Sequence, residues 1–285
     1  MKTSNSKYLA ITGATGYLGT HLAEHFSSQG LNLLLVGRNK KKLTDLKNNL
    51  LSRYKIQITI HEIDFSKFNA ESALDKIDSK IILSGMIHTV GDQKPIGPLM
   101  TQKMECIRSS VEVNFISAIL VSKFFISRSE GSKNSSIIFI SGGGATFPRE
   151  DFAIYGSAKA ALIRMVETLS FELKKFGISV NAISPGNMPS MMMNEILNFG
   201  NQVSADEMTT AQNTLQVEDV NVSKVIELCD FLLTESANKI TGRLISPKWD
   251  DWKNWLLHLN ELQESDLYTL RRITAKDRGL NWGDL

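Results

Sequence analysis

The amino-acid sequence predicts an α/β fold in which a single doubly wound parallel sheet carries helices on both of its faces. Short apolar runs alternate with longer helical patterns along the chain. This alternation is typical of strand–helix–strand units that build a parallel sheet. The 285 residues suit one large α/β domain or two small ones. No internal repeat, low-complexity tract or linker precedes about residue 247, so one domain is the simplest expectation.

Each expected element follows from its local pattern. The run from Ile137 to Ile140 is apolar throughout, for example, and is expected to be a core strand. The predicted strands are 8–12, 31–36, 56–63, a strand within 81–88, 137–141, 178–183 and 243–246. The predicted helices are a first one ending near 28, then 39–53, 66–77, 99–128 as two helices, 151–176 and 220–234. Residues 187–215 are expected to be irregular.

The bulk composition is that of an ordinary soluble globular protein. Hydrophobic residues make up 42% and charged residues 22% of the chain. A net charge of +2 gives no electrostatic reason to expect nucleic acid or an acidic membrane as a partner. No signal peptide is expected before the first strand, and no apolar run reaches the ~18 residues of a membrane span. Cys106 and Cys229 make no disulfide framework and have no metal-ligand spacing, so we expect a cytoplasmic protein without a metal.

A glycine-rich segment lies between the first strand and the first helix, where a dinucleotide-binding loop has to be. Its sequence is Thr12-Gly13-Ala-Thr-Gly16-Tyr-Leu-Gly19. Glycines let the backbone turn sharply and approach a pyrophosphate, and the helix N-terminus offers free N–H groups to it. The alternative is a glycine-rich turn that binds no ligand. The spacing is G-x-x-G-x-x-G, which differs from the commonest dinucleotide fingerprint.

The end of the second strand indicates which cofactor is bound. An acidic residue there would bind the ribose hydroxyls of NAD. This chain instead has Arg38, which suits a 2′-phosphate and favours NADP, with NAD possible. The alternative is that Arg38 and Lys40–Lys42 form the solvated basic start of a helix. After the third strand, Asp64 and Phe65 could hold the adenine, or Asp64 could simply cap the next helix.

Polar residues with possible catalytic roles follow the fourth and fifth strands. Tyr155 and Lys159 lie four apart on a predicted helix and therefore share one face. The ammonium would lower the pKa of the phenol, so that it could exchange a proton with an alcohol or carbonyl oxygen. The hydroxyl of Ser141, at the strand end, could hold the same oxygen. Asn114 sits in an apolar helix, as either a core hydrogen-bonder or part of a proton path.

These segments, taken in order, resemble the short-chain dehydrogenase/reductase family. The likeness rests on Thr12–Gly19, Asn114, Ser141, Tyr155 and Lys159, and it covers about residues 7–247. Two further segments are similar to family signatures, and they read Asn-Ala-Ile-Ser-Pro-Gly from 181 to 186 and Ile-Thr-Gly-Arg-Leu-Ile from 240 to 245. The resemblance implies a Rossmann-like fold and hydride transfer between NADP(H) and an alcohol/carbonyl pair.

The resemblance also implies a role for each matching residue. Tyr155 would be the general acid/base, and Lys159 would hold the nicotinamide ribose and lower the tyrosine pKa. Ser141 would orient the substrate oxygen, and Asn114 would support a water-linked proton relay. Further residues would contact the cofactor, namely Gly13, Thr15, Gly16, Tyr17, Leu18, Gly19, Pro185 and Gly186. The family is commonly dimeric or tetrameric through its long helices, so a homodimer or homotetramer is expected.

Four features depart from the family pattern. The glycine spacing and the sequence from His88 to Gly91 both look like the extended branch of the family, which acts on nucleotide sugars. His88 could touch the cofactor or be a structural histidine. Ser141 lies 14 positions before Tyr155, one more than usual, so that Gly142 occupies the usual serine offset. After the proline–glycine turn, Ser190 stands near where a threonine is common.

The C-terminal part is expected to form a separate segment. We divide the chain into a catalytic domain, 1–247, and a tryptophan-rich helical extension, 248–285. Trp249, Trp252 and Trp255 are three apart and would share one side of a helix. This helix could pack on its own domain, make a dimer contact or form a wall of the substrate pocket. A methionine-rich stretch, 188–193, occupies the place of the family's substrate lid and is followed by a polar, mobile segment, 194–215.

The leading prediction is an NADP-dependent oxidoreductase that acts on a small alcohol or carbonyl. One alternative is a nucleotide-sugar reductase, epimerase or dehydratase of a surface-polysaccharide pathway, in which Arg271 or Arg272 would meet a phosphate. Another is a cofactor-sensing protein without catalysis. The Tyr155–Lys159 pair argues against the sensor, because a sensor has no need of a tuned phenol.

Overall fold

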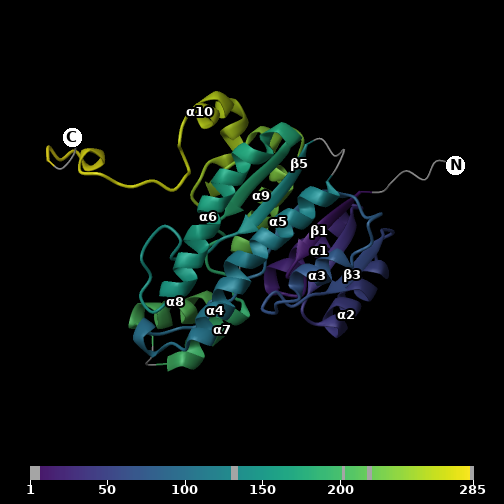
Figure 1. The fold of residues 1–285 in the computed structure, drawn as a ribbon, viewed down its shortest axis with the longest axis horizontal. Coiled ribbons are helices and arrows are strands. Elements are labelled where there is room, and N and C mark those ends of the chain that lie inside the picture. The colour runs from purple at the N-terminus through teal and green to yellow at the C-terminus, as the bar shows by residue number, and fades with distance from the viewer. Residues whose placement is uncertain (1–6, 130–133, 201–202, 217–219, 283–285) are drawn as a thin grey trace.

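The protein folds as a seven-stranded sheet with every strand parallel to its neighbours (Figure 1). The computed structural model describes residues 7–129, 134–200, 203–216 and 220–282. The strand order is β3-β2-β1-β4-β5-β6-β7. The strands are β1 Tyr8–Thr12, β2 Asn32–Gly37, β3 Ile58–Glu62, β4 Leu83–His88, β5 Ser135–Ile140, β6 Ile178–Ile183 and β7 Leu244–Ile245. The order reverses direction at β1 and β4, so this is the doubly wound sheet that the sequence predicted.

Helices cover both faces of this sheet. They are α1 Tyr17–Ser28, α2 Lys40–Leu51, α3 Ala70–Asp75, α4 Met104–Val111, α5 Ser117–Arg128, α6 Ala153–Leu173, α7 Met191–Phe199, α8 Ala205–Gln216, α9 Val220–Leu232 and α10 Leu259–Glu264. Helices α1, α2 and α9 pack in one hydrophobic core and α3, α5 and α6 in the other. Side chains of a strand alternate between faces. In β1, Leu9 and Ile11 accordingly enter the first core while Ala10 enters the second.

Helix α3 begins later than the sequence predicted. The expected helix started at Ser66, but the observed one begins at Ala70. The Asp64 carboxylate accepts hydrogen bonds from the backbone N–H of Ser66 at 3.0 Å and from its hydroxyl at 2.8 Å. These two bonds hold the chain in a local turn, a frequent competitor of helix formation.

The predicted pair of helices between 99 and 128 is one long helix. A 3₁₀ turn covers 99–101, and the helix then runs from Met104 to Arg128. Within it, Glu112–Ile116 form a π-helical turn between α4 and α5. By length and composition this helix could cross a membrane, but 44% of its apolar window is buried inside the protein. Val121 and Phe125 pack in the core beneath the sheet, as in the core helix of a globular fold.

The segment expected to be irregular forms two helices. Helices α7 and α8 pack against each other and bury Met193, Ile196 and Ala211. Phe152 and Tyr155 belong to the same small hydrophobic cluster. The two helices therefore form a lid over the start of α6.

The C-terminal segment packs on its own domain through two of the three tryptophans that were expected to share one side of a helix. Trp252 and Trp255 are buried in the core shared with α1 and α9, whereas Trp249 is 78% exposed. The segment 252–258 is a 3₁₀ helix, which places residues three apart on one side. Trp255 stacks on Tyr268 with ring centroids 4.3 Å apart. The backbone of Tyr268 accepts a hydrogen bond from the Leu244 N–H at 2.9 Å, so this segment also covers β7, the edge strand.

Candidate active site

The glycine-rich loop after β1 turns into α1 and leaves the N-terminus of that helix open. Gly13 has φ +74°, a conformation that favours glycine. A Cβ on Gly19 would lie 2.3 Å from the carbonyl oxygen of Gly13, so the helix and the loop approach closely. Gly16 precedes α1 without a side-chain cap, and the first turn has no acidic residue. An uncapped helix start with no carboxylate near it fits a bound anion, here the pyrophosphate of a dinucleotide.

The end of β2 lies beside this loop. A Cβ on Gly37, the last residue of β2, would be 3.4 Å from the Thr15 hydroxyl. Arg38 follows and is exposed. Burial raises the pKa of Asp64, but the hydrogen bonds from Ser66, helped by nearby positive charges that include Arg38, bring it below its usual value. One Asp64 oxygen is thus occupied by Ser66, and Phe65 next to it is buried.

Tyr155 and Lys159 lie together near the start of α6, at the carboxyl end of β5. The ammonium of Lys159 donates a hydrogen bond to the carbonyl oxygen of Ile140 at 3.0 Å. It lies 5.8 Å from the centroid of the Tyr155 ring. The two residues are 5% and 2% exposed, respectively. The structure therefore brings the predicted pair together at the end of the fifth strand.

The predicted lowering of the Tyr155 pKa is wrong for this structure, in which the phenol is buried. Burial raises the pKa of Tyr155 to about 12, with Arg149 opposing and Asp92 adding to the rise. Burial also lowers the pKa of Lys159 to about 8. The sequence argument considered only the attraction between the two groups, whereas removal from water disfavours the charged form of both. At neutral pH the phenol is protonated and the ammonium is mostly charged.

The serine at the end of β5 and the glycine after it occupy different positions relative to the phenol. The Ser141 hydroxyl is buried and has no hydrogen-bond partner in the described part of the chain. The Tyr155 hydroxyl faces Gly142 instead, where a Cβ would lie 2.1 Å from the phenolic oxygen. A side chain at 142 is therefore incompatible with this tyrosine position. An unsatisfied buried hydroxyl is unusual in folded proteins and is free to bond a ligand.

Asn114 lies in the π-helical turn and holds the chain after β4. Its side-chain oxygen accepts a hydrogen bond from the Asp92 N–H at 3.1 Å. Its amide donates to the carbonyl oxygens of Asp92 at 2.6 Å and Ser110 at 2.9 Å. A Cβ on Gly91 would lie 3.3 Å from the Lys159 nitrogen and 3.4 Å from the Asn114 oxygen. Asn114 is thus a core hydrogen-bonder, and its side-chain oxygen and the Lys159 ammonium both lie beside Gly91. Its position in a π-helical turn is also notable, because such turns often occur at functional sites.

His88 is a buried neutral residue at the end of β4. Its Nδ1 lies 2.7 Å from the Thr12 hydroxyl, and its Nε2 lies 3.1 Å from the Ser117 hydroxyl. Ser117 donates its own proton to the carbonyl oxygen of Val113, so it accepts from Nε2–H. Burial, with Lys159 nearby, lowers the pKa of His88 to about 3. These contacts match the structural alternative for this histidine.

The proline–glycine turn after β6 lies against the start of α9. Gly186 has φ +77°, and a Cβ there would be 3.5 Å from the Asn221 side-chain nitrogen. Asn221 donates a hydrogen bond to the carbonyl oxygen of Asn187 at 2.6 Å. Pro185 and Gly186 thus occupy the carboxyl end of β6. Ser190 is the N-cap residue of α7, and its side chain makes no capping hydrogen bond.

Several contacts that fasten the lid were missed from the sequence. Arg149, in the loop before α6, makes two hydrogen bonds to Glu207 of α8, at 2.6 Å and 2.7 Å. Its guanidinium also lies 3.6 Å from the centroid of the Phe152 ring. Lys94 forms an ion pair with Glu195 of α7 at 2.9 Å. The partners of the two ion pairs are far apart in sequence, and no local pattern connects them.

Within the residues that the structure describes, no group of three or more His, Cys, Asp or Glu side chains could hold a metal ion. The polar groups near Tyr155 are instead a buried ammonium, a free hydroxyl and an amide. They surround the carboxyl ends of β4 and β5, next to the open start of α1. This set suits proton exchange with an oxygen beside a bound dinucleotide.

Comparison with known proteins decides the family. Residues 7–200, more than half of the chain, match the family described as short chain dehydrogenase. The protein belongs to this family. It is an oxidoreductase of the NAD(P)-dependent kind, as the sequence resemblance implied.

Individual short-chain dehydrogenases show how far the likeness extends. A vibriobactin-specific 2,3-dihydro-2,3-dihydroxybenzoate dehydrogenase of Vibrio cholerae is 26% identical over 255 residues, which are 85% of this chain and 94% of that protein. An actinorhodin polyketide ketoreductase with NADPH has a TM-score of 0.72 at 20% identity, over 86% of this chain and 97% of its own. An NAD⁺-bound xylitol dehydrogenase has a TM-score of 0.73 at 21% identity, over 86% and 98%.

Proposed function

We propose that this short-chain dehydrogenase transfers a hydride between NADP(H) and an alcohol/carbonyl substrate, with Tyr155 as general acid/base. The observation that carries the proposal is the buried Tyr155–Lys159 pair at the carboxyl end of β5, whose ammonium is tied to Ile140. A tyrosine can exchange a proton with a substrate oxygen only if it is held within hydrogen-bond reach of it. The cofactor, when bound, would supply or accept the hydride.

Three neighbouring residues complete the proposed site. We assign Ser141 to the substrate oxygen, because its buried hydroxyl has no protein partner among the described residues. Lys159 supplies a positive charge and donors to the nicotinamide ribose. Asn114 supports a water-linked proton relay while it fixes the backbone at Asp92. At neutral pH the phenol of Tyr155 is protonated, so it can donate a proton to a carbonyl oxygen.

The remaining cofactor contacts come from the loops at the carboxyl ends of the strands. We assign the pyrophosphate to the loop after β1, the adenine to Asp64 and Phe65, and the nicotinamide to Pro185 and Gly186. The residues of the first loop are Gly13, Thr15, Gly16, Tyr17, Leu18 and Gly19. The uncapped start of α1 supports this placement.

We further propose that NADP is preferred over NAD. Arg38 follows β2, is exposed, and forms no ion pair with another described residue. Its guanidinium is therefore free for the fork-like hydrogen bonds that arginine makes to a phosphate. Similar solved structures include both an NADPH and an NAD⁺ complex, so Arg38 is the residue that supports NADP here.

The test is a fluorescence titration of NADPH and NADH against wild type, Arg38→Ala and the control Lys41→Ala. Loss of the arginine–phosphate bonds should weaken NADPH binding about 10- to 100-fold and leave NADH binding unchanged. The control, an exposed lysine in α2, should change NADPH affinity by less than about threefold. Equal affinities of wild type for the two cofactors would contradict the NADP assignment, and binding of neither would contradict the enzyme.

We also propose that the enzyme is a cytoplasmic homodimer or homotetramer. The family is commonly oligomeric, and less than half of the apolar window in the helix from Met104 to Arg128 is buried within one chain. Met104 itself is 57% exposed. A mass measurement by light scattering would test this directly, because a monomer at micromolar concentration would refute it.

A further inference from the structure

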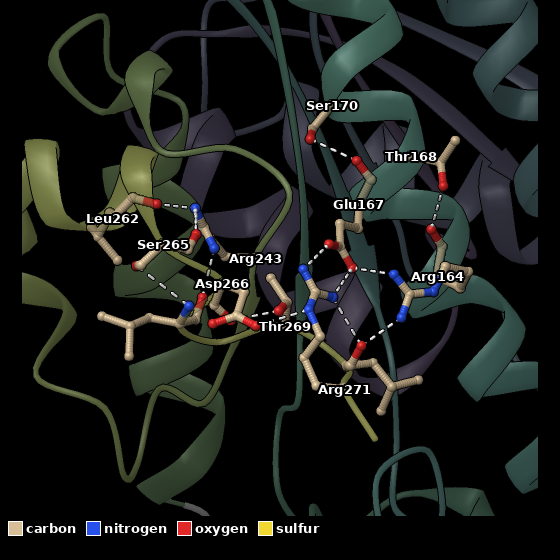
Figure 2. A network of polar contacts seen from close by, with 12 residues as sticks. Arg164, Glu167, Thr168, Ser170, Arg243, Leu262, Ser265, Asp266, Thr269 and Arg271 are labelled. Carbon is tan, nitrogen blue, oxygen red and sulfur yellow. Dashed lines mark hydrogen bonds and ion pairs between the residues drawn. The ribbon is translucent and has the colours of Figure 1, made fainter. Parts of the chain in front are cut away.

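A cavity lies between the C-terminal half of α6 and the C-terminal segment. It measures about 250 Å³ and is bordered by α6, by residues 238–243 and by parts of the segment 262–271. Figure 2 shows the polar network beside it, in which side chains from α6, from Arg243 just before β7 and from the C-terminal segment converge. Glu167 of this network lies 12 residues after Tyr155 on α6. That is about 18 Å along the helix axis, so the cavity is separate from the active site.

The charged groups at the base of the cavity are already paired within the protein. Both oxygens of Glu167 accept hydrogen bonds from Arg271, at 2.7 Å and 3.0 Å, and Arg164 contacts one of them (Figure 2). Arg243 is 8% exposed and donates to the carbonyl oxygens of Leu262, Ser265 and Leu267. Glu167 is the one carboxylate of the lining, and its charge is neutralised by arginines.

The unpaired charges at the cavity are all positive. Lys174 and Lys239 border it and are exposed, and neither ammonium forms an ion pair or hydrogen bond with another described residue. With Arg243 and Arg271 they give the lining four cationic groups against one carboxylate, a net charge of +3. A concave site lined by one sign of charge concentrates counter-ions of the other sign. The site therefore suits an anion.

The remaining walls are apolar. Phe171 borders the cavity with its ring 75% exposed, and Ile178, Ile240 and Leu262 form other parts of the wall. Pockets for small molecules typically combine apolar walls with a few placed polar groups. A ligand with an aromatic or apolar body would cover Phe171 while its anionic group reached the two lysines.

We propose that this cavity is a binding site for a small organic anion with an aromatic body and a phosphate or carboxylate group. Lys174 and Lys239 bind the anionic group, and Phe171 contacts the body. The site is independent of the proposed redox reaction, because none of these residues belongs to the active site.

The test is calorimetric titration of phenyl phosphate and of benzoate into the full-length protein saturated with NADP⁺, so that the cofactor site is occupied. We expect a dissociation constant of about 1 mM or below for at least one of them, and no detectable binding of neutral benzyl alcohol. The double variant Lys174→Gln/Lys239→Gln should weaken the anion about tenfold, since each exposed charge contributes modestly. If phenyl phosphate binds more tightly than benzoate, the site prefers a phosphate group. The opposite order identifies a carboxylate as the preferred group.

The matched control is Lys175→Gln, an exposed lysine next to Lys174 that does not border the cavity. It should leave the affinity unchanged, and all three lysine substitutions should preserve the thermal unfolding midpoint. Binding that is equal in wild type and the double variant would overturn the proposal. So would the absence of binding for both anions, or binding that Lys175→Gln weakens to the same extent.

Discussion

Replacing Lys159 by Met should stabilise the fold at neutral pH while it disables the active site. Burial lowers the pKa of this lysine from 10.5 to about 8. Holding the ammonium charged in the folded protein therefore costs about 3 kcal/mol relative to the unfolded chain. The variant removes this cost but leaves the Ile140 carbonyl, now 3.0 Å from the lysine, without its partner. That loss opposes the gain by about 1–3 kcal/mol.

The pH dependence of this effect separates the two contributions. Because the folded-state pKa is lowered, the unfolded chain binds more protons than the folded one between about pH 8 and pH 10.5. Wild-type stability therefore rises with pH through this window, and the penalty is fully present below about pH 8. The variant has no such group. We therefore compare the free energies of unfolding of the two proteins at each pH. The value for Lys159→Met minus the value for wild type should fall by about 2–3 kcal/mol between about pH 7 and pH 10.

The assay is urea unfolding followed by circular dichroism at the two pH values. The control is Lys175→Met, in which an exposed lysine is replaced, and its stability difference from wild type should be the same at both pH values. If the difference between Lys159→Met and wild type also stayed constant, Lys159 would not be a buried ammonium, and the reasoning would be refuted.

Three further predictions concern the groups around the phenol and the lid. Ser141→Ala should lower kcat/KM about 30-fold if its free hydroxyl holds the substrate oxygen, and an unchanged value would remove Ser141 from the site. Gly142→Ala should lower kcat/KM at least ~100-fold, because its Cβ would meet the Tyr155 hydroxyl at 2.1 Å. Gly143→Ala, whose Cβ would have nothing closer than 4.0 Å, should retain most activity, and equal losses in the two variants would contradict the packing argument. Glu207→Gln should speed amide exchange in α8 about tenfold by weakening a half-buried ion pair, and unchanged protection would show that this pair does not fasten the lid.

The sheet could be predicted from the sequence because parallel strands are buried on both faces. The run 178–183 is apolar or small except at Asn181, and the predicted and observed bounds of β6 agree. The order of Tyr155, Lys159 and the glycine-rich loop likewise placed the site at the carboxyl ends of the strands. These features depend on local composition and on topology, which are readable from one sequence.

The features that were missed depend on tertiary contacts. The lid was expected to be irregular, although Met193, Ile196 and Leu197 have a helical spacing that could have indicated α7. The Arg149–Glu207 pair joins positions 58 residues apart and has no sequence signal. The rise in the Tyr155 pKa comes from burial under this lid, which the sequence does not display.

The nucleotide-sugar alternative expected Arg271 or Arg272 to meet a substrate phosphate. Arg271 is bonded to Glu167 and Asp266, which leaves Arg272 as the candidate for that contact. A nucleotide-sugar epimerase or dehydratase would show tightly bound cofactor without net turnover of it, and a cofactor sensor would show binding without any reaction. Both are therefore separable from the proposed reductase by a turnover measurement.

The most direct test of the account is NADPH consumption by wild type and Tyr155→Phe over a panel of aromatic and aliphatic ketones, with sugar nucleotides included. Tyr8→Phe, which loses an exposed hydroxyl bonded to Gln57, is the control. We expect turnover by wild type and by the control, and a loss of at least ~1000-fold in kcat for Tyr155→Phe with unchanged NADPH affinity. Carbonyl reduction that persists in Tyr155→Phe would contradict the proposed role of Tyr155.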